Sequence, residues 1–157
     1  MKTETRYWLM KSEPESYSIG HLKKDRKTAW NGVRNYQARN FMRDMKIGDQ
    51  ILFYHSNCKV MGVYGVAKVA SAPYPDPTQF DPKSHYFDTK ATKAKPIWDL
   101  VDIAYVSMFK EPVTLIDIRA TPSLKSMIIL QTGSRLSVTP VDPAHFNTIL
   151  ALAKRYM

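Results

Sequence analysis

The strongest constraint on the fold is a succession of short apolar segments, each with the alternation or the β-branched content of a strand. We expect strands at residues 7–10, 51–54, 60–69, 97–109 and 136–138. Gly62 and Gly65 interrupt the third segment, which is typical of a strand that bends around the corner of a barrel. The pattern predicts a small sheet that curls on itself, in which the third strand pairs with the second.

Helical segments lie between the strands and are marked by their capping residues. Apolar residues over 36–45 have the spacing of an amphipathic helix, and Gly48 follows just past its end. The other expected helices are 18–23 after the cap Ser18, 114–118 after the cap Thr114, one turn from Pro122, and 142–153 with Pro143 at the first helical position. Together these elements predict an α+β fold, an open curled β-barrel of about five to six strands flanked by short helices.

Residues 72–95 are the longest segment without a predicted strand or helix. Their prolines exclude a central strand, because proline lacks the backbone donor of the ladder. We expect a long surface loop here, and loops of that length are often functional. Asn31-Gly32 favours a turn, which places Trp30 at the edge of a loop. No repeat or linker divides the chain, so we expect a single domain over residues 1–157.

The chain is basic, with 23 Lys and Arg against 14 Asp and Glu and a formal net charge of +9. Such an excess predicts a partner that carries phosphate. Much of the charge falls between His21 and Lys46, where it overlaps the segment of Trp30, and further lysines lie within 83–95. For residues 23–27 the alternative is a set of surface lysines that only keep the protein soluble.

The single cysteine, Cys58, excludes an internal disulfide and is typical of a reducing compartment. No apolar run approaches the roughly 18 residues of a membrane span. The N-terminus lacks the pattern of a signal peptide. We therefore expect a cytoplasmic protein, or a nuclear one if the source is eukaryotic, with no membrane partner.

Aromatic residues stand beside short polar ones in three stretches, at 7–14, 30–40 and 52–57. Bases lifted from their stack are held by aromatic faces and by hydrogen bonds to their edges, so this combination is typical of a pocket for a flat, polar ring. Trp30 is the candidate stacking face, and its alternative is a core tryptophan. The other candidate ligand-binding residues are Lys11, Ser12, Asn31, Gly32, Val33, Tyr54, His55, Ser56 and Asn57.

Phosphate contacts are expected where a helix N-terminus follows the Trp30 segment, because such an end is a ready anion site. The candidate phosphate ligands are Arg34, Asn35, Tyr36, Arg39, Lys24 and Lys27. The alternatives remain open. The two arginines could pair with carboxylates of the fold, and 55–57 could form a turn in which the histidine satisfies a backbone carbonyl. In the long loop, Tyr74 and Tyr86 either cover the pocket or anchor the loop.

The sequence contains no complete motif for a metal, a cofactor or a nucleophile. His55 and Cys58 are three residues apart, but no second cysteine exists to complete a tetrahedral site. No glycine-rich phosphate loop of the Walker or Rossmann type occurs. We expect no catalytic residues, no metal and no cofactor, and we expect a monomer.

Five motifs resemble those of the EVE domain family. They are Tyr7-Trp-Leu-Met-Lys-Ser-Glu-Pro14, Trp30-Asn-Gly-Val-Arg-Asn-Tyr-Gln-Ala-Arg-Asn40, Phe53-Tyr-His-Ser-Asn57, Tyr74-Pro-Asp-Pro-Thr78 and Arg135-Leu-Ser-Val138. The match spans nearly the whole chain, and five motifs in the right order are far more specific than any one of them. The resemblance implies a PUA-like fold and the recognition of modified bases in nucleic acid.

The EVE domain is also similar to the YTH domain, a reader of N6-methyladenine. By this resemblance Lys11 and Ser12 stand where the first YTH strand ends, and Trp30 stands where a cage tryptophan does. Here Asn31-Gly32 follow the tryptophan in place of the usual Ser or Thr, and the sequence offers no second cage tryptophan. The resemblance therefore implies a different base, with a modified cytosine as one choice and a methylated adenine as another.

Three functions follow from these observations. The first is a DNA- or RNA-binding module that accepts a flipped modified base in an aromatic and polar pocket while basic residues hold phosphates. The second is a PUA-like amidohydrolase that acts on a modified nucleoside through Lys11 and Glu13 as an acid and base pair. The third is an interaction domain with an empty pocket whose basic surface touches nucleic acid without specificity.

Overall fold

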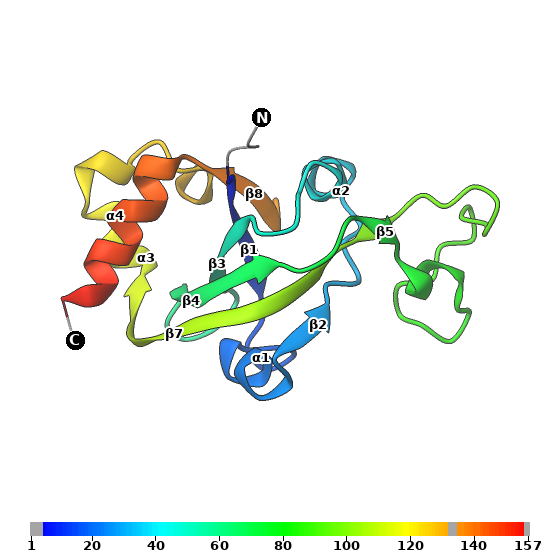
Figure 1. The fold of residues 1–157 in the computed structure, drawn as a ribbon, viewed down its shortest axis with the longest axis horizontal. Helices are drawn as coiled ribbons and strands as arrows, with labels where there is room; N and C mark the ends of the chain where they lie inside the picture. Colours follow the sequence, from blue (N-terminus) through cyan, green and yellow to red (C-terminus); the bar gives the residue numbers. More distant parts are fainter. Residues whose placement is uncertain (1–4, 132–134, 156–157) are drawn as a thin grey trace.

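The computed structural model describes residues 5–131 and 135–155, and within them the chain forms a six-stranded sheet with helices on both faces (Figure 1). Across the sheet the strand order is β2-β7-β4-β3-β1-β8. The strands of this sheet are β1 Tyr7–Ser12, β2 Lys27–Ala29, β3 Gln50–His55, β4 Gly62–Val69, β7 Asp102–Thr114 and β8 Val138–Val141.

The sheet is mixed and curled. β1 runs parallel to β3, whereas the other neighbouring strands pair antiparallel. The register slips between Phe53 and Tyr54 on β3 and again near Gly65 on β4. A Cβ at Gly65 would collide with the backbone oxygen of Ser107, so the close approach of β4 and β7 requires a residue without a side chain. Such irregularities bend strands, and the expected curled barrel of an α+β fold is confirmed.

The helices begin where their caps predict. Ser18 accepts a hydrogen bond from the backbone N–H of His21, and Thr114 accepts one from Asp117. Asp142 caps the last helix with Pro143 in its first turn. The α-helices are α1 Ile19–Asp25, α2 Tyr36–Arg43, α3 Leu115–Arg119 and α4 Pro143–Lys154, and the 3-10 turns are η1 Pro77–Phe80, η2 Pro122–Leu124 and η3 Ile128–Leu130.

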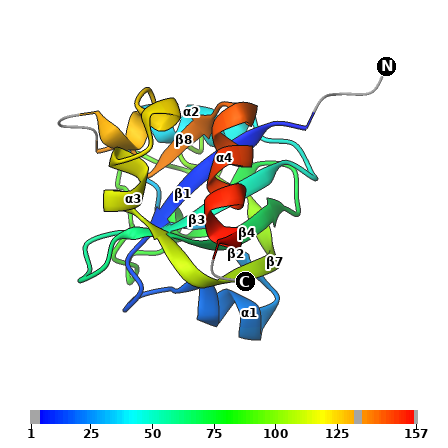
Figure 2. The same cartoon turned by 90° about the vertical axis from the view of Figure 1, so that its left-hand side faces the viewer.

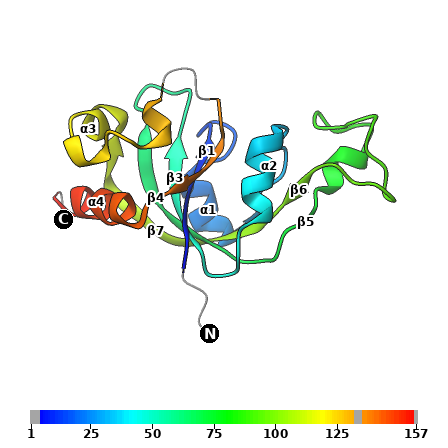
Figure 3. The same ribbon diagram turned by 90° about the horizontal axis from the view of Figure 1, so that it is seen from above.

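Two hydrophobic clusters lie on opposite faces of the sheet because successive residues of β1 point to opposite sides. Trp8 and Met10 belong to the cluster beneath α1 and α2, and Leu9 belongs to the cluster beneath α3 and α4. Figure 2 shows α4 lying across the strands, and Figure 3 shows α3 and α4 on one side of the sheet with α2 on the other. The end of β1 lies close to the turn before α1 and to the segment that precedes α2.

Residues 76–98, here called the strap, form a long excursion that extends from the sheet at the right of Figure 1. The two-residue strands β5 Tyr74–Pro75 and β6 Asp99–Leu100 pair at its base. The fully buried side chain of Gln79 joins the two ends of the strap. Its amide accepts from the backbone N–H of Trp98 at 2.8 Å and donates to the carbonyl of Trp98 at 2.7 Å. The expected long loop is therefore an ordered, internally bonded segment.

Several boundaries differ from the sequence expectation. The helix expected over 36–45 ends at Arg43, and the strand expected at 97–109 is divided into β6 and β7. The strand expected at 136–138 begins only at Val138 and continues to Val141. Pro140 is tolerated there because β8 is an edge strand, where a missing backbone donor costs little. Within the described residues, no helix is long and apolar enough to cross a membrane.

Candidate functional site

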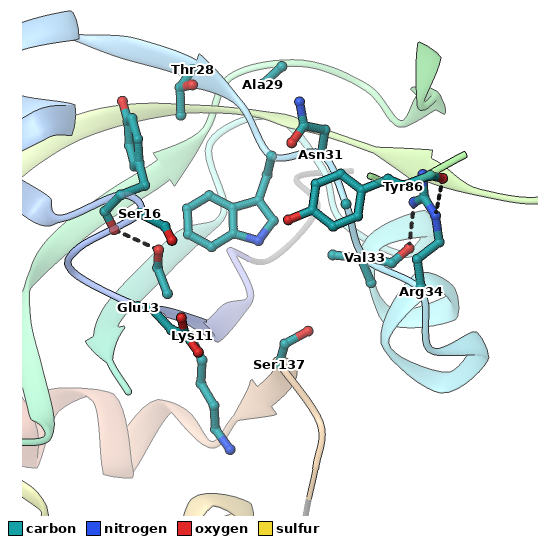
Figure 4. Close-up of a pocket in the computed structure, with 14 residues that line it drawn as sticks. Lys11, Glu13, Ser16, Thr28, Ala29, Asn31, Val33, Arg34, Tyr86 and Ser137 are labelled. Carbon is teal, nitrogen blue, oxygen red and sulfur yellow. Dashed lines mark hydrogen bonds between the residues drawn. The ribbon is translucent and has the colours of Figure 1, made fainter. Parts of the chain in front are cut away.

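A cavity of about 630 Å³ opens where the end of β1, the turn before α1, the segment after β2 and the strap meet. In Figure 4, Lys11 and Ser137 lie on one side, Thr28 and Ala29 lie on the opposite side, and Tyr86 with Arg34 forms a further edge. This volume is within the usual range of small-ligand pockets. The lining residues are Lys11, Ser12, Glu13, Ser16, Tyr17, Thr28, Ala29, Trp30, Asn31, Gly32, Val33, Arg34, Tyr86 and Ser137.

Trp30 is half-buried at the wall of this cavity, and contacts of its backbone and of its ring fix its position. Its backbone N–H donates to the carbonyl of Val101 at 2.9 Å, and the edge of its ring system meets Phe53 at a centroid distance of 5.5 Å and 89°. The indole N–H groups of Trp8 and Trp98 both donate to buried or half-buried aspartates. Within residues 5–131 and 135–155, the indole N–H of Trp30 has no such partner, so it is the tryptophan with a donor left for a ligand.

The polar side of the cavity comes from the end of β1. Ser12 donates its hydroxyl to the carbonyl of Tyr17 at 2.6 Å, and the backbone N–H of Lys11 donates to the carbonyl of Ser137 at 2.8 Å. Burial lowers the pKa of Lys11, because the charged amine loses hydration there. Glu13 follows the strand and accepts a hydrogen bond from the side chain of Asn57 at 3.0 Å. Donors and acceptors for a base edge are therefore present along one wall.

Asp76, fully buried at the start of the strap, fixes the rim opposite β1. Its carboxylate accepts from the backbone N–H of Gly32 at 2.8 Å, from Arg34 at 3.1 Å and from Thr78. Burial alone would raise the pKa of Asp76, but the hydrogen bonds from Thr78, Gly32 and Arg34 outweigh it and hold the pKa below its usual value. Nothing in the sequence near position 76 points to a partner 44 residues away, so the sequence alone does not predict this contact.

Tyr86 brings a second aromatic side chain to the cavity from the strap. Gly32 has a φ of 87°, and a Cβ built there would lie 2.6 Å from the Tyr86 ring. Arg34 donates Nε and Nη2 to the carbonyl of Tyr86 at 3.1 and 2.8 Å. The sequence left two roles open for this tyrosine, and the structure places it on the cavity wall. The sequence indicates the turn at Asn31-Gly32, but it does not indicate that Tyr86 packs against this turn.

The end of β3 does not reach the cavity, although its polar residues are candidate contacts for the edge of a base. Tyr54 is buried beneath the α3 and α4 face, and burial raises its pKa to about 12. The Nε2 of His55 accepts from the backbone N–H of Ile19 at 3.1 Å, and its ring stacks on Tyr64. Ser56 donates its backbone N–H to the carbonyl of Ser12. Asn57 has a φ of 50° and reaches the site only through Glu13. Tyr54 and His55 are buried in the interior, and none of these four residues lines the cavity.

The structure gives the candidate phosphate ligands different surroundings. All five N–H groups of Arg34 donate to protein oxygens, and four of these bonds fasten the strap to the segment after β2. Asn35 caps α2 by accepting from the backbone N–H of Ala38. Arg39 donates to the carbonyl of Ile97 at 2.9 Å. The remaining candidates are exposed and lie close to the cavity in sequence: Lys24, Lys27 and Tyr36.

Lys11 and Glu13 both line the cavity, as an acid and base pair would require. β1 ends at Ser12, however, so the two side chains do not project from one strand face, and the described residues contain no ion pair between them. No group of three or more His, Cys, Asp or Glu with metal-binding geometry occurs within the described residues. The side chains that line this cavity can stack on a planar ring and form hydrogen bonds with its edges.

The chain is similar over nearly its whole length to proteins of known sequence and structure. Human thymocyte nuclear protein 1 is 39% identical over 173 residues, covering 99% of this chain and 77% of the human protein. A crystal structure of human THYN1 protein in complex with 5-methylcytosine-containing DNA superposes with a TM-score of 0.90 at 39% identity, covering 96% of this chain and 98% of that one. A Pseudomonas putida protein of known crystal structure has a TM-score of 0.92 at 48% identity, covering 94% and 99%.

These similarities confirm the PUA-like fold that the motifs implied. The family model described as the EVE domain matches residues 6–152, nearly the whole chain. The chain therefore belongs to the EVE domain family.

Proposed function

We propose that this protein is a nucleic-acid-binding module that reads a modified base, with 5-methylcytosine as its first candidate, by accepting it in the cavity beside Trp30. The observation that carries the proposal is the half-buried indole of Trp30 on the wall of a cavity of about 630 Å³, with its N–H unpaired among the described residues. The likeness to human THYN1 protein, whose complex contains 5-methylcytosine DNA, supports the choice of base.

Access to the cavity requires the base to leave its stack. An extruded base loses stacking and pairing, which costs a few kcal/mol, and aromatic contact in the pocket returns about 1 to 3 kcal/mol per base. Trp30 supplies one aromatic surface, and Tyr86 at the strap supplies another. Their combined contact offsets the cost of extrusion, and the polar wall of Ser12, Glu13 and Ser137 distinguishes one base edge from another.

Phosphates on either side of the base meet positive charge. Lys24 and Lys27 are exposed just before the cavity residues Thr28 to Trp30, and Arg135 is exposed just before Ser137 on the other side. Contacts of this kind position a strand without reading its sequence. The affinity of the protein for nucleic acid therefore falls with salt, while its preference for the modified base does not.

The test is a comparison of fluorescence anisotropy for strands that differ by one methyl group. Parent protein, Trp30→Ala and Trp30→Phe are titrated with labelled DNA and RNA that carry 5-methylcytosine, cytosine or N6-methyladenine at one position. We expect the parent to prefer the 5-methylcytosine strand, Trp30→Ala to lose about five- to hundredfold of that affinity, and Trp30→Phe to retain most of it. If the parent protein binds methylated and unmodified strands equally, the proposal is wrong and the protein binds nucleic acid only through a nonspecific basic surface.

A further inference from the structure

A second aromatic surface lies outside the cavity, at the first residue of α2. Tyr36 is 58% exposed, yet its ring is fixed, because it stacks on Trp98 at a centroid distance of 4.8 Å and an interplanar angle of 28°. Asn35 holds the helix end on which it stands. A tyrosine that is both exposed and immobilised offers a stacking face at little further cost in side-chain entropy.

The support beneath this tyrosine is rigid. Trp98 is buried, its indole N–H donates to Asp88 at 2.8 Å, and its backbone N–H and carbonyl are both bonded to the buried amide of Gln79. The guanidinium of Arg39 lies 4.9 Å from the Tyr36 ring centroid and donates to the carbonyl of Ile97. These contacts hold the ring of Tyr36 over the ring of Trp98.

This surface is continuous with the cavity. The guanidinium of Arg34, a cavity residue, lies 5.4 Å from the centroid of the Tyr86 ring and 5.4 Å from the centroid of the Trp98 ring. The ring of Tyr36 stacks on the ring of Trp98. Tyr86, Arg34, Trp98 and Tyr36 thus form a column of successive contacts that runs from the cavity rim to the exposed tyrosine.

The charge along the column fits the same ligand. Arg39 belongs to α2 beside Tyr36, and Lys95 is exposed on the strap two residues before Ile97, whose carbonyl Arg39 contacts. Of the nearby carboxylates, Asp99 is paired with Arg43, whereas Asp88 accepts from the neutral indole N–H of Trp98 and keeps its negative charge. An aromatic platform bordered by cations is the usual surface for an unstacked base with its phosphates.

We propose that Tyr36 is a second base-stacking site, which takes an unpaired base neighbouring the one in the cavity on the same strand. The inference deepens the proposed function, since it adds a contact that reads strand structure around the modified base. Because stacking tolerates every base, this site favours a strand opened near the modification without specifying its sequence.

The test uses short single-stranded DNA with a central 5-methylcytosine and, on the 5′ or the 3′ side, either normal nucleotides or abasic residues that keep the phosphates. For the parent protein, we expect abasic residues on one side to weaken binding by about five- to hundredfold. Tyr36→Ala should bind the normal and abasic strands equally, and the matched variant Tyr36→Phe should behave as the parent does. Equal affinity of the parent for all strands, or an abasic penalty that survives in Tyr36→Ala, overturns the proposal.

The same strands with an unmodified central cytosine separate this site from the cavity. A Tyr36-dependent abasic penalty without any preference for the methylated base means that the stacking site stands and the proposed pocket function fails. A preference for the methylated base without an abasic penalty means that the proposed pocket function stands and the stacking site at Tyr36 fails. The penalty in the parent protein requires no variant, so the result does not depend on how Tyr36→Ala folds.

Discussion

Gly32 and Tyr86 are in contact so close that a methyl group on the glycine would lie 2.6 Å from the tyrosine ring. The two residues are 54 positions apart and join the segment after β2 to the strap. The missing side chain at position 32 thus sets where the second aromatic wall of the cavity stands.

Replacing this glycine tests the arrangement against a matched control. Gly32 and Gly48 have similar φ values of 87° and 95°, but a Cβ at Gly48 would meet nothing within 4 Å. We expect Gly32→Ala and Gly48→Ala to lose comparable stability, about 1 kcal/mol or more for the left-handed backbone. Only Gly32→Ala should also displace Tyr86 and weaken binding of the 5-methylcytosine strand. Thermal unfolding and anisotropy measure the two effects, and equal binding by both variants would mean that Tyr86 is no part of the pocket.

Local features of this fold could be predicted from the sequence, because their causes lie within a few residues. The caps Ser18 and Thr114 bond within their own first turns, so their sequence pattern is sufficient to place α1 and α3. β2 was missed because it is three residues long and pairs with β7 at the sheet edge, too short for its alternation to be recognised.

The site could be predicted only in part, for a related reason. Trp30 and Ser12 were identified because aromatic and polar residues adjoin them in the chain. Asp76 and Tyr86 reach the cavity through the strap, whose course depends on buried contacts such as those of Gln79. His55 is a candidate from the sequence because it is a polar residue at the end of a strand, but its side chain is buried and accepts from the backbone N–H of Ile19.

The environment of His55 predicts a pH dependence of stability. Burial lowers its pKa to about 4, whereas an imidazole in the unfolded chain takes up its proton near pH 6.5. Between these two values the unfolded state binds more protons than the folded state. Stability that is present above about pH 6.5 is therefore lost as the pH falls toward 4, by at most about 1.4 kcal/mol per pH unit.

Urea unfolding of the parent and of His55→Gln across pH 4 to 7 measures this loss. The variant should be less stable at pH 7, because the acceptor for the Ile19 N–H is disturbed, and its stability should change less with pH. A variant whose stability falls as steeply as that of the parent over this range would show that another group causes the dependence.

The two lysines before the cavity predict a salt effect. Lys24 and Lys27 are exposed, and β2 leads from Lys27 into the cavity wall. We expect each Lys→Gln change to reduce the slope of log affinity against log salt by about 0.7 for single-stranded DNA. The preference for 5-methylcytosine over cytosine should stay constant, because phosphate contacts carry no base information.

Lys125→Gln is the control for this titration. Lys125 is also exposed but follows η2, which packs with the α3 and α4 cluster on the other face of the sheet. Its slope should equal that of the parent. An equal reduction of the salt slope at all three lysines would mean that the whole basic surface attracts nucleic acid without defined phosphate contacts. An unchanged slope at Lys24 and Lys27 would mean that the phosphates bind elsewhere on the protein.

The most direct measurement of the central claim is an NMR titration of the indole signals with single-stranded DNA that contains one 5-methylcytosine. Trp8 and Trp98 bond their indole N–H groups within the protein, so their signals should stay nearly in place. The account predicts that the Trp30 signal, assigned with Trp30→Phe, shifts on binding, and that the base methyl gives a nuclear Overhauser contact to the Trp30 ring. A bound strand that leaves the Trp30 signal unmoved and gives no such contact would contradict it.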